Sequence, residues 1–347
     1  MMTARCSLVL ALILLANEPL CAQANFFSRM FGGGRQEKAD QPTGAQTATG
    51  TEAQVGTVIS YQDNVLVARL ANNNRMPLIG VGVGSSPHRI VGSLVSSALQ
   101  ESKLIRLIDT AHASKNEAMV AHGILNGVKT VESDGPVEIH VITKVWYTHL
   151  GYERTKLSVE ESLADLQSAI DSDKVDLRVH LLLHWPKCYE SIPWMDCQQE
   201  EDSLDNAVKA AGPDPRLDQE NAWKESWRYF EDIYLSDEYP IESIGISNFH
   251  LDDIEKMDKF ARIHPHVLQV NLWSLLYDSH LVDYCHKHRI HIQAYNALQG
   301  TVVEPARAPH AYHHIQKVAN ELSRETGSTI SVAQTVLAWL VQHGVAV

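Results

Sequence analysis

Short apolar runs with strand character alternate with segments of helical period along most of the chain, and this alternation restricts the fold more than any other feature. The predicted strands are residues 78–81, 104–109, 139–144, 179–184, 241–246, 267–271, 291–295 and 345–347, and the predicted helices include 116–127, 158–170, 218–235, 251–261, 279–288 and 331–343. Because each strand and helix pair takes about 35 residues, the pattern favours an α/β fold of the (β/α)8 TIM-barrel type over an open doubly wound sheet. The helix at 158–170 is expected to begin with a capping box formed by Ser158 and Glu161.

The first 24 residues have the layout of a secretory signal peptide. A single arginine precedes an apolar run from Cys6 to Ala16, and small residues end the segment at Ala22-Gln23-Ala24. We predict cleavage after Ala24 and entry into the secretory pathway, with a signal anchor or a buried helix as the alternatives. The apolar run is short for a membrane span, so membrane contact is expected only through this segment if it stays uncleaved.

Residues 25–54 carry three consecutive glycines and many Thr, Gln and Ala, without apolar periodicity. Such a composition predicts a flexible spacer between the leader and a barrel that occupies residues 55–347. The alternative is the second half of a bipartite presequence that leads to a plastid-like organelle. Two apolar-alternating runs separated by an Asn-rich turn at residues 57–81 predict a β-hairpin in front of the barrel.

Composition excludes some functions. The net charge is −13 and no Lys/Arg-rich run occurs, so no nucleic acid partner is expected. Beyond the leader, only Cys188, Cys197 and Cys285 remain, and their spacing matches no zinc motif, so no metal is expected. Cys188 and Cys197 could pair in an oxidising lumen. An acidic insertion at about residues 187–217 is expected to form a lid or a partner surface.

Three titratable residues stand at the carboxyl ends of consecutive predicted strands. Asp109 follows IRLI, Lys144 follows IHVIT and His184 follows HLLL. In a parallel barrel these ends converge on one mouth, where active sites are built. Each residue alone has a structural explanation, but three of them at regular intervals favour a catalytic site.

Seven motifs in the same order carry a resemblance to a known family. They are RMPLIGVG, LIDTA with its following NE, ITKVW, LLHWP, IGISNF, the segment around Gln269, and AYNAL. The chain thereby resembles the aldo-keto reductase superfamily from about residue 57 onwards. The resemblance implies hydride transfer from NADPH to a small aldehyde or ketone. It also implies that Asp109, Lys144 and His184 are the aspartate, lysine and histidine that accompany a catalytic tyrosine in that family.

The tyrosine itself is replaced, because the family spacing puts Ser114 where the phenol belongs. A serine hydroxyl is too weak an acid to protonate an alkoxide at neutral pH, and loss of a general acid typically costs about 10²- to 10⁴-fold in rate. Two substitutes are conceivable. Tyr147, three residues after Lys144, is favoured over His112 because it restores a phenol beside an ammonium group.

The resemblance also implies a nicotinamide site. Ser247 and Asn248 of the SNF motif, with Gln269, match the residues that hold the carboxamide, and Tyr295 matches the aromatic residue that stacks on the ring. The family's I-P-K-S loop and phosphate-binding helix follow the eighth strand, and the sequence reads QHGVAV there, so we expect a truncated eighth βα unit. The alternative function is a non-catalytic relative that senses a cofactor or binds a partner protein.

Overall fold

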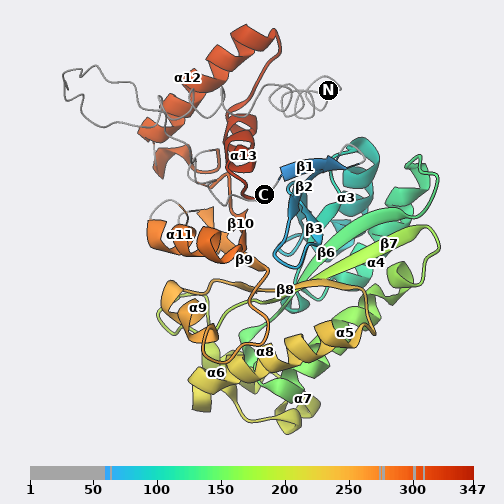
Figure 1. The fold of residues 1–347 in the computed structure, drawn as a ribbon, viewed down its shortest axis with the longest axis vertical. Helices are drawn as coiled ribbons and strands as arrows, with labels where there is room; N and C mark the ends of the chain where they lie inside the picture. The colour runs from blue at the N-terminus through green and yellow to red at the C-terminus, as the bar shows by residue number, and fades with distance from the viewer. Residues whose placement is uncertain (1–58, 63–64, 273–274, 276–277, 300–301, 308) are drawn as a thin grey trace, which may run out of the picture. The chain divides into compact units, whose positions relative to one another are not determined.

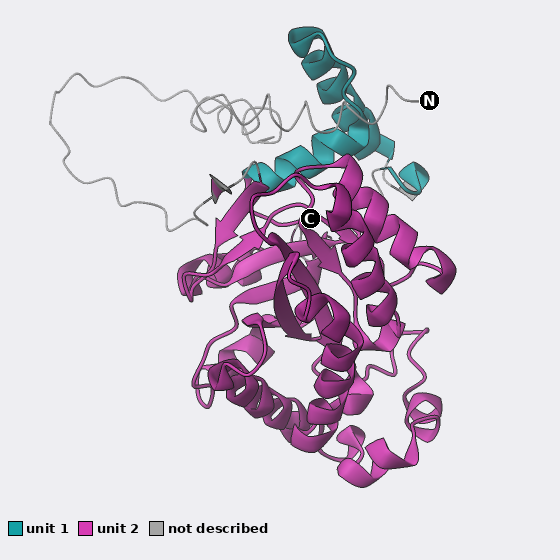
Figure 2. Cartoon of the chain, turned by 90° about the vertical axis from the view of Figure 1, so that its right-hand side faces the viewer, with its two compact units in different colours: residues 1–56, 298–342 teal, residues 57–297, 343–347 magenta. Residues whose placement is uncertain are grey.

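The fold is described from a computed structural model, which describes residues 59–347 except 63–64, 273–274, 276–277, 300–301 and 308 (Figure 1). The predicted signal peptide and spacer lie outside these residues. Two compact units are distinguished: residues 57–297 with 343–347, and residues 298–342 with 1–56 (Figure 2). None of the helices formed by the described residues is long and apolar enough to cross a membrane.

The larger unit contains a parallel sheet whose strands follow one another in chain order. They are β4 (Gly80–Gly82), β5 (Leu107–Asp109), β6 (Val137–Val145), β7 (Val175–Leu183), β8 (Ile241–Ser247), β9 (Val267–Asn271) and β10 (His291–Tyr295). Most side chains of β6 and β7 are buried, because helices cover one face and the barrel interior the other. The structure confirms the predicted (β/α)8 class.

The last residues of the chain join the two edges of this sheet. Ala346 exchanges backbone hydrogen bonds with Ile292 and Ala294 at the β10 edge. Val347 bonds to Leu78 and Gly80 at the β4 edge, with N to O distances of 2.8 Å. The predicted eighth strand at 345–347 forms a single bridge, at Ala346, and not a regular strand. Its backbone hydrogen bonds to both edges still close the ring.

A small antiparallel sheet precedes the barrel, as the alternating pattern predicted. It consists of β1 (Ile59–Gln62), β2 (Val65–Arg69) and β3 (Arg75–Pro77). The Asn-rich turn joins β2 to β3, and the side-chain amides of Asn72 and Asn74 both donate to the carbonyl oxygen of Glu242 at 2.9 Å. These bonds fasten the turn to the start of β8.

Helices connect the strands of the larger unit. They are α3 (His88–Glu101), α4 (Glu117–Gly127), α5 (Tyr152–Ile170), α6 (Cys197–Asp202), α7 (Asn206–Ala211), α8 (Gln219–Ser236), α9 (Leu251–Met257) and α11 (Ser279–His288). Short 3-10 turns lie at His112–Ser114, Val128–Thr130, Tyr147–His149 and Pro215–Asp218. Helix α3 was not predicted from the sequence.

The predicted capping box at Ser158 and Glu161 is wrong. Helix α5 begins six residues earlier, after Gly151, whose φ of 106° suits glycine and whose N–H donates to Ala222 O and Ser226 Oγ on α8. Ser158 is buried inside the helix, and Glu161 instead reaches His112. Contacts with α8 determine where α5 begins. A capping pattern describes only neighbouring residues, so it could not predict this start.

The second unit contributes α12 (Pro309–Thr326) and α13 (Val332–Gln342) to the description, with a 3-10 turn at Pro305–Arg307. Val318 and Leu322 on α12 pack with Ile330 and with the partly buried Trp339 on α13. Helix α13 lies within the predicted helix 331–343, whereas α12 was not predicted.

Buried imidazoles lie on strands of the parallel sheet. His140 on β6 and His180 on β7 bond to each other through Nδ1 and Nε2 at 2.9 Å, and His180 Nδ1 lies 2.7 Å from Ser243 Oγ on β8. Neither ring nitrogen of the buried His291 finds a hydrogen-bond partner among the described residues. Burial lowers the pKa of His291 from 6.5 to about 4, so it stays neutral in the folded protein.

Replacing His291 should therefore change the dependence of stability on pH. Between about pH 6.5 and pH 4 the unfolded chain takes up a proton that the folded chain does not, so the buried imidazole lowers the stability of the wild type progressively more as the pH falls. Urea denaturation should find His291→Leu more stable than the wild type near pH 5 by on the order of 2 kcal/mol. The difference should be smaller at pH 7.5. An equal shift at both values, or none, would show that His291 is not held neutral by burial.

Candidate active site

The carboxyl ends of β5 and β6 bring Asp109 and Lys144 into direct contact. Lys144 Nζ donates to Asp109 Oδ1 at 2.7 Å and to the carbonyl oxygen of Thr110 at 2.7 Å. The lysine side chain is 4% exposed and the aspartate side chain 22%. A buried ammonium group is costly without an ion-pair partner, and Asp109 is that partner.

Gln269 shares the same carboxylate. Its Nε2 donates to Asp109 Oδ2 at 2.6 Å and to Gln293 Oε1 on β10 at 3.0 Å. An ionised carboxylate only accepts hydrogen bonds, so the amide nitrogen must face Asp109 and the Gln269 carbonyl oxygen must point elsewhere. The aspartate thus connects β5, β6 and β9 at one mouth of the barrel.

His184 follows the last residue of β7 and faces an aromatic neighbour. Its ring meets that of Trp146 edge to face at 4.8 Å, and its backbone oxygen accepts from Asn248 Nδ2 at 2.9 Å. Burial, and secondarily the charge of Lys144, hold the pKa of His184 well below its usual value. The imidazole is therefore neutral near pH 7, and its Nδ1 is buried without a partner among the described residues.

The residues matched to the nicotinamide site also lie together. Asn248, with a left-handed φ of 59°, turns back so that its Nδ2 also reaches Ser247 Oγ at 3.1 Å. Its Oδ1 accepts from the Tyr295 hydroxyl at 2.7 Å. The left-handed backbone is tolerated by Asn better than by most residues, which explains the residue type. These contacts join the ends of β7, β8 and β10.

Buried polar residues next to Ser114 in the sequence fix the loop after β5. Thr110 Oγ1 bonds to Asn116 Oδ1, and Asn116 Nδ2 donates to Val83 O at 3.1 Å. The buried Glu117 accepts from Thr143 Oγ1 and from Ser162 Oγ, both at 2.9 Å. The Asn-Glu pair at the start of α4 is thus explained by satisfied buried polar groups that tie β5, β6 and α5 together.

Neither predicted substitute for the tyrosine is bonded to Lys144. His112 Nε2 lies 2.5 Å from Glu161 Oε2 and 2.9 Å from Lys115 Nζ. Tyr147 is buried, and burial followed by the nearby Glu200 carboxylate raises its pKa above the usual value. The role of Tyr147 as proton donor stays a prediction.

Ser114 lies next to Gly84, in the loop that follows β4. A Cβ on Gly84 would come within 3.2 Å of Ser114 Oγ, so this glycine leaves room beside the serine.

The insertion after His184 is firmly attached at its centre. A disulfide joins Cys188 to Cys197, the pairing considered for an oxidising lumen. Arg154 on α5 forms two 3.0 Å bonds to the carboxylate of Glu201 on α6, and both side chains are largely buried. Trp146 Nε1 donates to Glu200 Oε2 at 2.6 Å.

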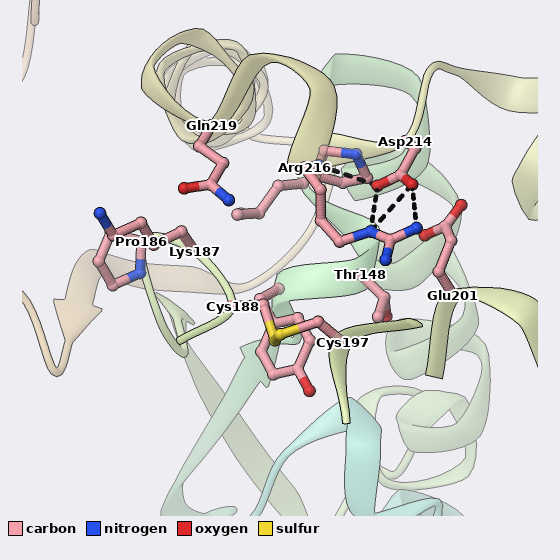
Figure 3. A pocket seen from close by; sticks show the side chains of 12 residues that line it. Thr148, Pro186, Lys187, Cys188, Cys197, Glu201, Asp214, Arg216 and Gln219 are labelled. Carbon is pink, nitrogen blue, oxygen red and sulfur yellow. Dashed lines mark hydrogen bonds and ion pairs between the residues drawn. A yellow bond between two sulfur atoms is a disulfide. The ribbon is translucent and has the colours of Figure 1, made fainter. Parts of the chain in front are cut away.

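A very small cavity lies beside the disulfide, and Glu201 is among the residues that line it (Figure 3). Tyr147 is among its lining residues, and its volume of about 10 Å³ is roughly the space of one water molecule. Figure 3 shows Arg216 turned towards Asp214, with which it pairs, and Cys188 next to Cys197. A cavity of this size is too small for a carbonyl substrate.

A model of the aldo/keto reductase family matches residues 94–347. The chain belongs to the aldo/keto reductase family. Glyoxal reductase from Bacillus subtilis is 30% identical over 292 residues, which cover 82% of this chain and 81% of that protein. D/L-glyceraldehyde reductase from Hypocrea jecorina is 26% identical over 76% of this chain and 73% of its own length. The protein is accordingly an aldo-keto reductase-like oxidoreductase.

Solved structures support the fold. An aldo/keto reductase from Brucella melitensis has a TM-score of 0.57 and 24% identity, covering 81% of this chain and 86% of that one. An aldo-keto reductase from Bombyx mori, solved in complex with NADP, has a TM-score of 0.57 and 22% identity over 81% of each chain.

Sequence reasoning missed several residues of the site. Gln293, in the middle of β10, bonds to Gln269, and Thr110 supplies a carbonyl to Lys144. Gln293 is a polar residue in the interior of β10, between the apolar Ile292 and Ala294, and this was its signal in the sequence. The contact of Trp146 with His184 joins residues from two strands and required the tertiary structure.

Proposed function

We propose that this protein reduces small aldehydes or ketones with NADPH. The observation that carries the proposal is the buried contact of Lys144 with Asp109, which Gln269 shares. This contact brings the Lys144 amine and the Gln269 amide to one carboxylate at the ends of β5 and β6. The names of the relatives, a glyoxal reductase and a glyceraldehyde reductase, support two- and three-carbon aldehydes as substrates.

His184 suits the task of orienting a carbonyl. Because its imidazole is neutral, one ring nitrogen carries a proton that can be donated to a carbonyl oxygen. The Lys144 charge nearby stabilises negative charge that develops on the same oxygen. Trp146, packed edge to face on His184, limits the rotation of the imidazole.

Lys144 itself is the proton donor in this proposal. An ammonium group has three protons, and those of Lys144 reach Asp109 Oδ1 and Thr110 O, with no third acceptor among the described residues. The remaining proton is available to an alkoxide, and lysine serves as a general acid in other enzymes. Asp109 then holds the neutral amine in place until it is protonated again.

The residues present fit a nicotinamide group. A carboxamide requires both a donor and an acceptor, and the Gln269 carbonyl oxygen, turned away from Asp109, is the acceptor. The Ser247 hydroxyl accepts from Asn248 and keeps its own proton to donate. The ring of Tyr295, held by its hydroxyl to Asn248, offers a flat face for stacking. NADPH bound there would supply the hydride.

Two variants distinguish the proton donors. Lys144→Met should lower the turnover of glyoxal or D/L-glyceraldehyde by about 10²- to 10⁴-fold. Tyr147→Phe should keep turnover within about twofold, because its buried hydroxyl makes no hydrogen bond to the described residues. Steady-state loss of NADPH absorbance measures both, and NADPH binding by fluorescence is the control for intact folding.

A large loss in Tyr147→Phe would return the phenol to the role of proton donor. If the wild type binds NADPH but turns over no aldehyde or ketone, the result would favour the non-catalytic alternative, a cofactor-sensing protein. Absence of NADPH binding would contradict the proposed function as a whole.

Restoring the family's phenol offers a separate test. Ser114→Tyr should raise carbonyl reduction several-fold, because a phenol beside an ammonium group is a stronger acid than a serine hydroxyl. The kcat for glyceraldehyde, compared with that of Ser114→Phe, isolates the hydroxyl from the ring. Equal kcat values in the two variants, with NADPH binding intact, would mean that the added phenol takes no part in proton transfer.

We also propose that the chain enters the secretory pathway, with a plastid-like organelle as the alternative. The leader pattern of residues 1–24 and the disulfide of the insertion both support an oxidising compartment. In a eukaryotic host, secreted or lumenal protein should begin at Asn25 and contain one disulfide. A chain that lacks residues 1–24 should stay in the cytosol as the control. Full-length cytosolic protein with free thiols would contradict this localisation.

A further inference from the structure

Two histidines and an aspartate gather at the surface of the larger unit. They are Asp258, just after α9, His264 in the loop before β9, and His288, the last residue of α11. One ligand atom from each lies within 4.8 Å of those of the other two. Helices α9 and α11 contact each other, which brings the three segments together (Figure 1).

Tyr284 holds two of these side chains in position. Its hydroxyl donates to the Asp258 carboxylate, with distances of 3.0 Å to Oδ1 and 3.1 Å to Oδ2. Its ring stacks on that of His288 with centroids 4.0 Å apart and planes 13° from parallel. Such supporting contacts orient ligands before a metal arrives and reduce the cost of binding.

The imidazoles have weak partners within the protein. His264 Nδ1 is 3.4 Å from Asp258 Oδ1, which is longer than a strong charged hydrogen bond. His288 makes no hydrogen bond to any residue that the structure describes, and only its ring faces are packed. Both imidazoles can therefore turn a ring nitrogen towards a shared ion, and the carboxylate retains lone pairs beside its bonds to Tyr284.

We propose that Asp258, His264 and His288 bind a zinc ion, with water in the remaining position. Two imidazole nitrogens and a carboxylate oxygen are a ligand set that Zn²⁺ favours, whereas Ca²⁺ and Mg²⁺ prefer oxygen ligands alone. The ion ties together the end of α9, the start of β9 and the end of α11. The expectation of no metal considered only the cysteines, because histidines separated by 24 positions form no recognisable motif.

This site is distinct from the catalytic mouth. His264 precedes β9 by three residues, and helices that return from the mouth end at the amino side of the strands. Lys144, Asp109 and Gln269 lie at or towards the carboxyl ends. Zinc bound at this cluster should therefore act on stability and leave the residues around Lys144 unchanged.

The experiment is a competition titration of the metal-free full chain with Zn²⁺ and a chromophoric chelator. The wild type should bind one zinc ion tightly, and His264→Ala and His288→Ala should each weaken that binding by at least about 100-fold. Tyr284→Phe should weaken it about 10-fold, because it removes only a supporting contact. Since the chain has 18 histidines, weak zinc binding to other surface histidines must be distinguished from binding at this site.

His286→Ala is the matched control, because His286 is an exposed residue of the same helix and is not part of the cluster. It should bind zinc like the wild type. A second control, His310→Ala on α12, tests the histidines of the other unit. Saturating zinc should raise the melting temperature of the wild type and both controls by several degrees and leave that of His264→Ala unchanged.

Cobalt gives a direct view of the ligands. Co²⁺ in the wild type should show d–d absorption bands of a nitrogen and oxygen site, and these bands should disappear in His264→Ala and His288→Ala. Zinc affinity unchanged in both of those variants, or equally reduced in His286→Ala, would overturn the proposal. Loss of aldehyde reduction with intact zinc binding would contradict only the proposed function.

Discussion

Closure of the barrel by the last residues of the chain is the constraint on which the rest of the larger unit depends. Ala346 and Val347 bond to both edges of the sheet, to β10 on one side and to Leu78 and Gly80 on the other. Once the ring is closed, the carboxyl ends of all the strands must surround a single mouth. Polar residues that are far apart in the sequence thereby come within hydrogen-bonding distance.

Asp109 then organises that mouth. One oxygen of its carboxylate receives the Lys144 ammonium, and the other receives the Gln269 amide. The first contact gives a buried amine a counter-charge, and the second turns the Gln269 carbonyl oxygen away from the carboxylate. In the proposed function, a single acidic side chain thereby sets both the charge next to the developing alkoxide and the orientation of the amide proposed to hold nicotinamide.

Histidines serve different purposes at different depths of the protein. His184 at the mouth is neutral and next to a cation, His140 and His180 form a bonded chain inside the barrel, and His291 is buried without a partner. His264 and His288 stay near solvent, where imidazoles can be metal ligands. Burial and neighbouring charges decide between these roles, since the side chain is the same in each case.

The sequence by itself determined the fold class, the order of the strands, and the alignment of Asp109, Lys144 and His184 at strand ends, because residue periodicity and strand termini are local properties. The resemblance of its motifs to the family further predicts that Ser114 stands where the family has a tyrosine. The start of α5 and the sharing of Asp109 with Gln269 were decided only by tertiary structure. The proximity of His264 to His288 was likewise decided only by the tertiary structure. All three features depend on contacts between segments that are distant in the sequence, and local sequence patterns do not contain such contacts.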